Sequence, residues 1–162
     1  QNPLSEHIFN HDSLPDDLIE VDPEYTFDNA IKIIGYRVVN AAGDIVLEAS
    51  SGDVLYLETY FEVIWSGANE RPSNREMFIH VDYGNQRLNG DHDVVDGIFP
   101  LNYWVPGEIV RDRYELVVDR GSAAGNYGIH IGFFSGDSRM ITEPTTPDNR
   151  IRLGFLRITG GL

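Results

Sequence analysis

The strict alternation of apolar and polar residues in VLYLETYFEVI, residues 54–64, constrains the fold of this chain most. One side of the extended segment carries Leu55, Leu57, Phe61 and Val63, and the other side carries Tyr56, Glu58, Tyr60 and Glu62. A period of two residues is typical of a strand that turns one face to a core. Residues 76–82 and 127–134 alternate in the same way. We therefore predict an all-β protein.

Further short β segments follow one another between residues 30 and 158, at a spacing of about ten residues and with Gly or Pro in the connections. This spacing predicts an antiparallel β-sandwich, immunoglobulin-like or jelly-roll-like, of at least seven strands. The domain is expected to span residues 30–162. Its core should include Leu55, Leu57, Phe61, Ile79, Val81, Tyr127, Ile129 and Ile131.

The composition narrows the function classes. The 162 residues carry a net charge of -14, which disfavours nucleic acid as a partner because phosphate binding needs clustered cations. The chain has no Cys, so disulfides, thiolate zinc sites and a Cys nucleophile are excluded. No apolar run is long enough to span a membrane. Lack of Cys fits an exported protein, and we expect the periplasm or the bacterial cell surface.

Residues 1–29 differ from the rest of the chain and are expected to form an extended, acidic N-terminal arm. Pro15 and Pro23 oppose a helix there, and the period-two pattern is poor. Such an arm is ordered only if it docks on its own domain or on a neighbour. Because the chain begins with Gln1, we expect that a signal peptide or a membrane domain once preceded it. The candidate partner-binding anchors are Leu14, Leu18, Ile19, Val21, Tyr25 and Phe27.

Four segments carry a resemblance to known families: NGDHD, YWVPGEIVRD, the GNY strand entry and DNRIRLG. Residues 31–158 resemble the soluble β-sandwich domains appended to bacterial lipid-carrier-dependent glycosyltransferases, which also occur alone in exported proteins. The layout of the segments is also similar, more weakly, to the glycan-binding sandwich at the end of O-antigen exporter ATPases. Both resemblances imply a sandwich fold and an envelope location, and neither supplies catalytic residues. The arm matches neither family.

The stretch NGDHDVVDG, residues 89–97, is the densest cluster of polar groups. Its candidate metal ligands are Asp91, Asp93 and Asp96, but no complete ligand spacing is present. Asp and Asn also accept backbone N–H groups in turns, so we interpret the stretch as a structured loop without a metal. On the strand that follows, Asp112 is expected to hold an arginine such as Arg150 or Arg152 across the sheet.

Aromatic and histidine side chains oppose the predicted core residues on several strands. Sugars stack on aromatic rings and hydrogen-bond to carboxylates, so this face is a candidate glycan site formed by Tyr56, Glu58, Tyr60, Phe78, His80 and His130. Gly128 and Gly132 flank His130 and predict a shallow slot that a ligand could enter. The competing interpretation is that the arm or a partner covers the rings, because exposed aromatic patches rarely stay bare.

No nucleophile motif, phosphate loop or dinucleotide fingerprint is present, so we predict a non-enzymatic binding protein without a cofactor. The first alternative is an accessory subunit that docks on another protein of a membrane-associated assembly through its arm. The second alternative is a carbohydrate-binding module for a cell-envelope polysaccharide.

Overall fold

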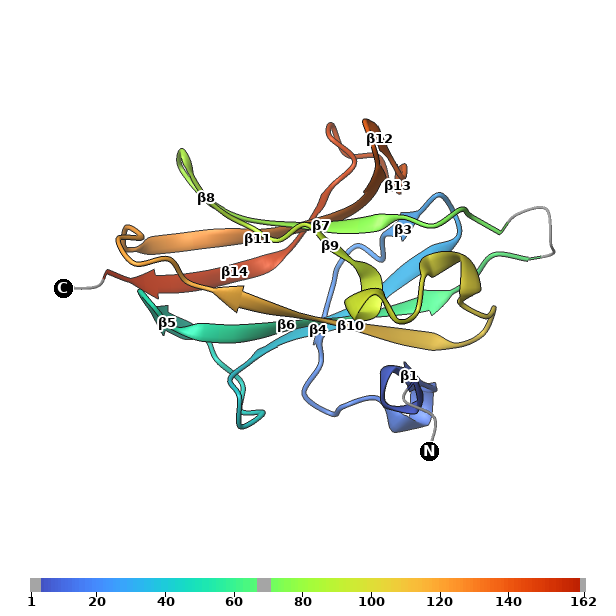
Figure 1. Ribbon diagram of the computed structural model, residues 1–162, viewed down its shortest axis with the longest axis horizontal. Coiled ribbons are helices and arrows are strands. Elements are labelled where there is room, and N and C mark those ends of the chain that lie inside the picture. The colour runs from blue at the N-terminus through green and yellow to red at the C-terminus, as the bar shows by residue number, and fades with distance from the viewer. Residues whose placement is uncertain (1–3, 67–70, 161–162) are drawn as a thin grey trace.

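The computed structural model describes residues 4–66 and 71–160, which form two seven-stranded sheets packed face to face (Figure 1). Sheet A contains, in spatial order, β1 (Ile8–Phe9), β10 (Ile109–Val117), β6 (Val54–Val63), β4 (Ile31–Val39), β3 (Thr26–Phe27) and β13 (Thr142–Glu143), with β2 (Ile19–Glu20) paired to β4. Sheet B contains β5 (Glu48–Ser50), β14 (Ile151–Thr159), β11 (Gly125–Ser135), β7 (Glu76–Tyr83) and β8 (Gln86–Asn89), with β12 (Ser138–Arg139) on β11 and β9 (His92–Asp93) on β7.

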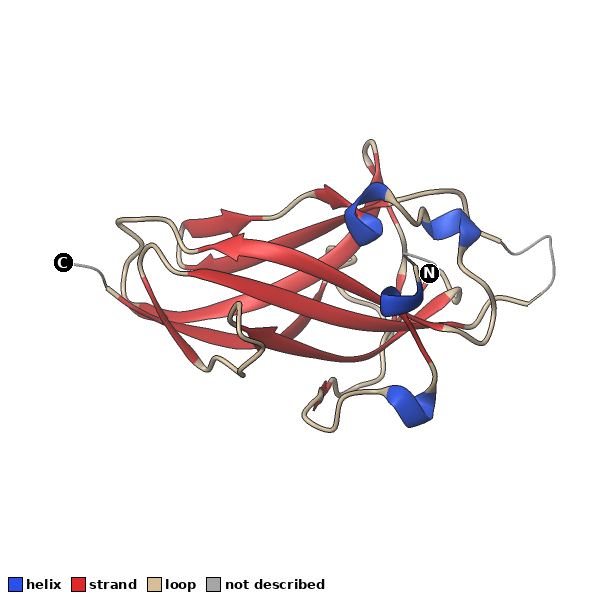
Figure 2. Cartoon of the chain, turned by 60° about the horizontal axis from the view of Figure 1, so that its bottom comes forward, coloured by secondary structure: helices blue, strands red, loops and turns tan. Residues whose placement is uncertain are grey.

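Neighbouring strands are antiparallel, and among the described strand pairs only β5 runs parallel to its neighbour, β14. Short 3-10 helices gather at the end of the sandwich away from the C-terminus (Figure 2): η1 (Ser5–His7), η2 (His11–Ser13), η4 (Val94–Gly97) and η5 (Leu101–Tyr103). None of the helices in the described part of the chain is long and apolar enough to cross a membrane. The predicted all-β sandwich is confirmed.

The core lies between the two sheets and is built by the period-two pattern. All eight predicted core residues are at most 3% exposed. A cluster of rings fills one part of this core: the ring centroids of Phe27 and Phe133 are 5.0 Å apart, those of Phe61 and Phe133 5.2 Å, and those of Phe61 and Trp104 6.2 Å. The two phenylalanine pairs meet edge to face, and contacts of this kind add to the free energy gained by burying the rings.

The N-terminal segment folds onto sheet A. Strand β1 pairs with the edge of β10, whereas β2 and β3 pair with β4. Phe27, at the end of this segment, is fully buried between Phe61 and Phe133. The residues expected to form an arm therefore contribute three short strands and a core ring to the sandwich. We call residues 4–13, which lie across the outer face of sheet A, the N-terminal strap.

Candidate functional site

The structure divides the six predicted glycan-binding residues between two sheets. Tyr56, Glu58 and Tyr60 lie on β6 in sheet A, whereas the other three lie on β7 and β11 in sheet B. In each strand these residues alternate with core residues, so they turn to opposite outer faces of the sandwich. The expectation that all six lie on neighbouring strands is therefore wrong, and each face has to be considered separately.

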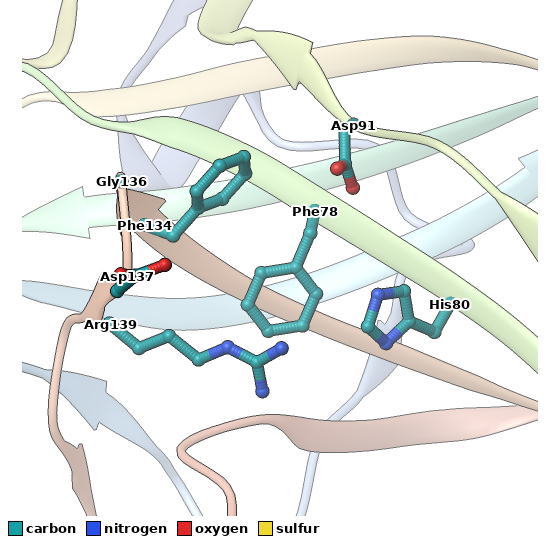
Figure 3. A pocket seen from close by; sticks show the side chains of 7 residues that line it. All are labelled: Phe78, His80, Asp91, Phe134, Gly136, Asp137 and Arg139. Carbon is teal, nitrogen blue, oxygen red and sulfur yellow. The ribbon is translucent and has the colours of Figure 1, made fainter.

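The outer face of sheet B carries an open cleft of about 310 Å³, which we call the Phe78 cleft. Figure 3 shows Phe78 at its centre, with Arg139 and Phe134 on one side and His80 on the other. The guanidinium carbon of Arg139 lies 4.3 Å from the centroid of the Phe78 ring, and the His80 ring lies 4.7 Å from it. Asp91 and Asp137 complete the wall. The cleft thus combines apolar ring surface with both hydrogen-bond donors and acceptors.

A network of charges supports this cleft from beside His80. The Nη1 group of Arg150 donates to Asp82 Oδ2 at 2.8 Å and approaches His80 Nδ1 at 3.3 Å, and its Nε lies 2.7 Å from Asp148 Oδ2. Arg87 donates to the same Asp82 carboxylate at 2.7 Å. Burial opposes the charged form of Asp82, but the two arginines outweigh it and lower its pKa to about 2. The Asp82 carboxylate is therefore charged at neutral pH and keeps its ion pairs with both arginines.

His80 is a neutral imidazole in this network. Because Arg150 can only donate, His80 Nδ1 accepts the hydrogen bond and the ring proton resides on Nε2. Burial, followed by the positive charge of Arg87, lowers the pKa of His80 to about 4. A neutral ring with one N–H donor suits recognition of uncharged hydroxyl groups better than it suits binding of an anion.

A second cleft of about 350 Å³ lies on the other side of Arg150, and we call it the His130 cleft. His130 pairs with His80 across β11 and β7, so the two clefts adjoin on one face. The loop that carries Asp148 stands between them, since the Asp148 carbonyl accepts a hydrogen bond from Arg139 at 2.8 Å. The Nδ1 atom of His130 is buried without a hydrogen-bond partner among the described residues.

The space that Gly128 and Gly132 leave beside His130 is filled by side chains. A Cβ atom on Gly132 would lie 2.2 Å from the Phe78 ring, and a Cβ on Gly128 would lie 2.9 Å from the His130 ring. The two glycines therefore make room for neighbouring rings within the sheet and do not form the slot. The opening beside His130 is instead the His130 cleft, which Arg150 and Arg152 also line.

Arg139, Arg150 and Asp148 could not be assigned to this face from the pattern of residues. Arg139 ends the two-residue strand β12, and the other two lie on the connection between β13 and β14.

The outer face of sheet A is organised around Glu58, which is 3% exposed. Its carboxylate lies 2.8 Å from Arg37, 3.2 Å from Arg113 and 3.9 Å from Arg111. The Tyr60 hydroxyl donates to the same carboxylate at 3.2 Å. Burial and the charge of Glu58 raise the pKa of Tyr60 to about 12, so the phenol keeps its proton.

The two rings predicted to contact a glycan on this face differ: Tyr60 is covered, whereas Tyr56 is half-buried and lines an open cleft. Tyr60 is fully buried beneath the strap, where Phe9 meets it edge-on with 5.3 Å between the centroids. The guanidinium of Arg113 lies 4.0 Å from the centroid of the Tyr56 ring. The N-terminal segment therefore covers Tyr60, as the competing interpretation of these rings expected.

The DHD stretch folds around a buried ion pair between His92 and Asp112. His92 Nε2 lies 2.7 Å from Asp112 Oδ2, and its Nδ1 lies 2.9 Å from the Gly90 carbonyl. Both partners are acceptors, so both ring nitrogens donate and the ring is an imidazolium. Burial alone would lower the pKa of His92, but the hydrogen bond and charge of Asp112 raise it overall. The expectation that Asp112 holds Arg150 or Arg152 is wrong: Asp112 points into the core and holds His92.

Asp91, Asp93 and Asp96 do not converge. Asp91 lines the Phe78 cleft on sheet B, whereas Asp96 lines a cleft on the sheet A side. Asp96 and Val95 adopt positive φ angles of 52° and 50°, and the Val95 N–H donates to Asp112 Oδ1 at 2.8 Å. No group of three or more His, Asp or Glu side chains in the described ranges could hold a metal ion. The stretch connects the two sheets and is anchored by Asp112.

The six predicted partner-binding anchors differ in exposure. Val21 and Phe27 are buried in the core of the domain. Ile19 is 37% exposed, and Leu14, Leu18 and Tyr25 are half-buried. In this conformation, four of the six anchors keep surface that a partner could contact.

The chain shares its fold with the C-terminal domain of wzt. The crystal structure of that domain matches with a TM-score of 0.60 and 13% sequence identity, over 92% of this chain and 91% of that one. Further solved chains also match. No protein-family model and no curated protein matches the sequence. The match supports the second resemblance at the level of the fold, whereas the likeness to glycosyltransferase-appended domains gains no support.

Proposed function

We propose that this domain is a non-catalytic carbohydrate-binding module of the periplasm or cell surface, which binds a cell-envelope glycan on the outer face of sheet B. The observation that carries the proposal is the pair of adjoining clefts, of about 310 and 350 Å³, on either side of Arg150. Clefts of this size, with a few fixed polar groups, are typical of small-ligand sites. Two clefts in a row suit successive residues of a polymer.

The groups in the clefts fit sugar hydroxyls, which both donate and accept hydrogen bonds. Asp91 and Asp137 supply acceptors, and Arg139 supplies donors. Asp82 and Asp148 neutralise the charge of Arg150. Arg150 therefore holds these side chains in place and does not attract anions. Ring surface from Phe78 and Phe134 can contact the apolar face of a sugar. Because the chain carries a net charge of -14, it repels anions at long range, which favours a neutral glycan.

The test is binding of the domain to purified envelope polysaccharides, with Arg139→Ala and Arg157→Ala compared. Arg139 lies in the Phe78 cleft, whereas Arg157 is an exposed arginine near Glu48 on the edge of the same sheet. Loss of Arg139 should weaken binding about tenfold, because charge-assisted hydrogen bonds contribute about 1.5–3 kcal/mol. The Arg157 variant should bind as the unmodified chain does. Equal binding by all three proteins would exclude this face as the glycan site.

We keep docking on a membrane-associated assembly as a second proposal, because Ile19 is 37% exposed beside the half-buried Leu18. The matched control is Ile45, which is also 37% exposed but lies on the turn after β4. If the arm docks the domain, Ile19→Asp should abolish co-purification with the assembly while Ile45→Asp should not. Retention of both variants in the assembly would count against docking through the arm.

A further inference from the structure

Two arginines line the His130 cleft, and they differ in what they contact. Arg150 is held by carboxylates on two sides, since Asp82 lies 2.8 Å from its Nη1 and Asp148 lies 2.7 Å from its Nε. The side chain of Arg152, on β14, forms no hydrogen bond or ion pair with any other residue that the structure describes. The cleft therefore contains one exposed guanidinium group whose N–H donors have no acceptor in the described part of the chain.

The ring of Phe155 fixes the position of this guanidinium group. The guanidinium carbon of Arg152 lies over the Phe155 ring, 4.7 Å from its centroid. Phe155 is 55% exposed on the outer face of sheet B, where it lies opposite Gly128 of β11. Arg152 Cδ lies 3.6 Å from the point that a Cβ atom of Gly128 would occupy. The stem of Arg152 thus passes beside this glycine toward Phe155.

The contact between Arg152 and Phe155 leaves the donors of the guanidinium group free for a ligand. A guanidinium group over an aromatic ring is attracted by the negative charge on the face of the ring, and its N–H groups point outward in the guanidinium plane. The attraction at an exposed site favours the stacked orientation about two- to fivefold. A side chain that is already oriented loses less conformational entropy when a ligand binds. Phe155 therefore preorganises a hydrogen-bond donor at the cleft.

The other groups that line the His130 cleft suit a neutral ligand with hydroxyl groups. Asp22 and Asp148 supply carboxylate acceptors, and their two negative charges balance those of the two arginines. Tyr25 contributes ring surface from the N-terminal segment. With donors, acceptors and a ring in one cleft and no excess of charge, the lining matches a single sugar residue better than a free anion.

We infer that Arg152 recognises the glycan in the His130 cleft by donating two parallel N–H groups to two neighbouring oxygens of one sugar residue, with Phe155 as its positioning residue. The inference rests on the proposed function, because it concerns the same face of sheet B and the same glycan. The planar guanidinium group presents two donors side by side, which the ammonium group of a lysine does not. Oxygens on adjacent carbon atoms of a sugar ring match that arrangement.

The test is binding of purified neutral envelope oligosaccharides to variants of the full chain. Arg152→Gln and Arg152→Lys should each weaken binding about tenfold, because both lose the paired donors although lysine keeps the charge. Phe155→Leu should weaken binding about two- to fivefold, because it keeps an apolar side chain but removes the aromatic face. Phe155→Tyr, which keeps that face, should bind as the unmodified chain does. Arg157→Gln, an exposed arginine beside Glu48 on the same strand, is the control and should leave binding unchanged.

A double variant separates positioning of Arg152 from a general effect on the sheet. If Phe155 acts through Arg152, Phe155→Leu should cause no further loss of affinity in the Arg152→Gln background. In the unmodified chain, the ¹⁵N–¹H resonance of the Arg152 Nε–Hε group should shift when the oligosaccharide binds. Unchanged thermal unfolding of each variant confirms that it is folded.

Two results would overturn the inference: full affinity in Arg152→Lys, or equal losses from Phe155→Leu in both backgrounds. If the Arg152 variants bind normally while Arg139→Ala binds weakly, the proposed glycan site stands and this inference alone fails. If no oligosaccharide binds the unmodified chain, the proposed function and the inference fail together.

Discussion

At the scale of single residues, the domain places ionisable side chains where apolar ones would be expected. Asp112 alternates with Val110 and Leu116 on the inner face of β10 and is 1% exposed. It is tolerated there because His92 and the Val95 N–H satisfy both of its oxygens. Removing one member of a buried pair leaves the other uncompensated, which makes such pairs sensitive to substitution.

We predict that Asp112→Asn lowers the pKa of His92 and destabilises the domain by about 2–4 kcal/mol. The asparagine keeps the shape of the side chain but removes the charge that holds the imidazolium. Histidine ¹H–¹³C spectra over a pH series give the pKa, and urea unfolding gives the free energy. Asp119→Asn, at an exposed position, is the control and should change stability by less than about 0.5 kcal/mol. An unchanged His92 pKa in Asp112→Asn would contradict the ion pair.

The raised pKa of His92 sets the pH range in which the pair stabilises the fold. The folded chain holds the proton more tightly than the unfolded chain, whose histidine pKa is about 6.5. The stabilisation is therefore complete below about pH 6.5 and is lost as the pH rises through the folded pKa of His92. We expect the difference in unfolding free energy between the unmodified chain and Asp112→Asn to shrink from pH 6 to pH 9.

His80 should show the opposite behaviour, because folding lowers its pKa to about 4. The folded chain keeps His80 neutral while the unfolded chain takes up a proton below about pH 6.5. The contribution of His80 to stability is thus present above that pH and declines as the pH falls toward 4. A titration of the His80 ring signals should give a midpoint well below 6, and a midpoint at 6.5 or above would show that Arg150 does not donate to its Nδ1.

At the scale of elements, the N-terminal strap is held by a few contacts. Its ladder to sheet A is two residues long, Ile8 opposite Val110 and Phe9 opposite Ile109. Phe9 is its ring anchor, since it meets the Tyr60 ring on one side and the Arg111 guanidinium, 5.5 Å from its centroid, on another. A short ladder with one ring anchor predicts a segment that opens at a lower free energy than the sandwich.

Phe9→Ala should therefore destabilise the domain by about 1–2 kcal/mol, less than a fully buried phenylalanine would. The same substitution should speed amide hydrogen exchange in the strap far more than in β6 or β11. Phe155→Ala is the control, because that ring is 55% exposed, and its cost should be smaller. Equal protection of the strap amides in the Phe9 variant and the unmodified chain would mean that other contacts hold the strap.

At the scale of the whole molecule, the fold could be predicted from the sequence because the inner faces obey a period of two. Leu57 and Ile129 lie in the core for that reason alone. The strands of the N-terminal segment could not be predicted in this way, because each is only two residues long and too short to show a period. In the sequence, Phe27 is an isolated apolar residue in an acidic stretch, yet its ring packs in the centre of the core against Phe133.

The candidate site was predicted in part. Phe78, His80 and His130 could be proposed from the sequence because they oppose core residues in their strands. A period of two residues does not indicate, however, which of the two sheets a strand joins. Sheet assignment depends on long-range pairing, and for that reason Tyr56 and Tyr60 were grouped with residues on the other side of the sandwich. The Asp112–His92 pair had a visible signal, because Asp112 shares a face with Val110 and Leu116.

The central claim is that the outer face of sheet B binds a neutral cell-envelope glycan, and a shift map of the backbone amides during titration tests it most directly. Purified neutral envelope oligosaccharides are added to the ¹⁵N-labelled chain at low and high salt. We predict shifts confined to β7, β11, residues 136–152 and the other residues that line the two clefts, Asp22, Tyr25 and Asp91. The affinity should change little with salt, because a neutral ligand forms no ion pair on binding. Shifts confined to sheet A, or none with any neutral oligosaccharide, would contradict the claim.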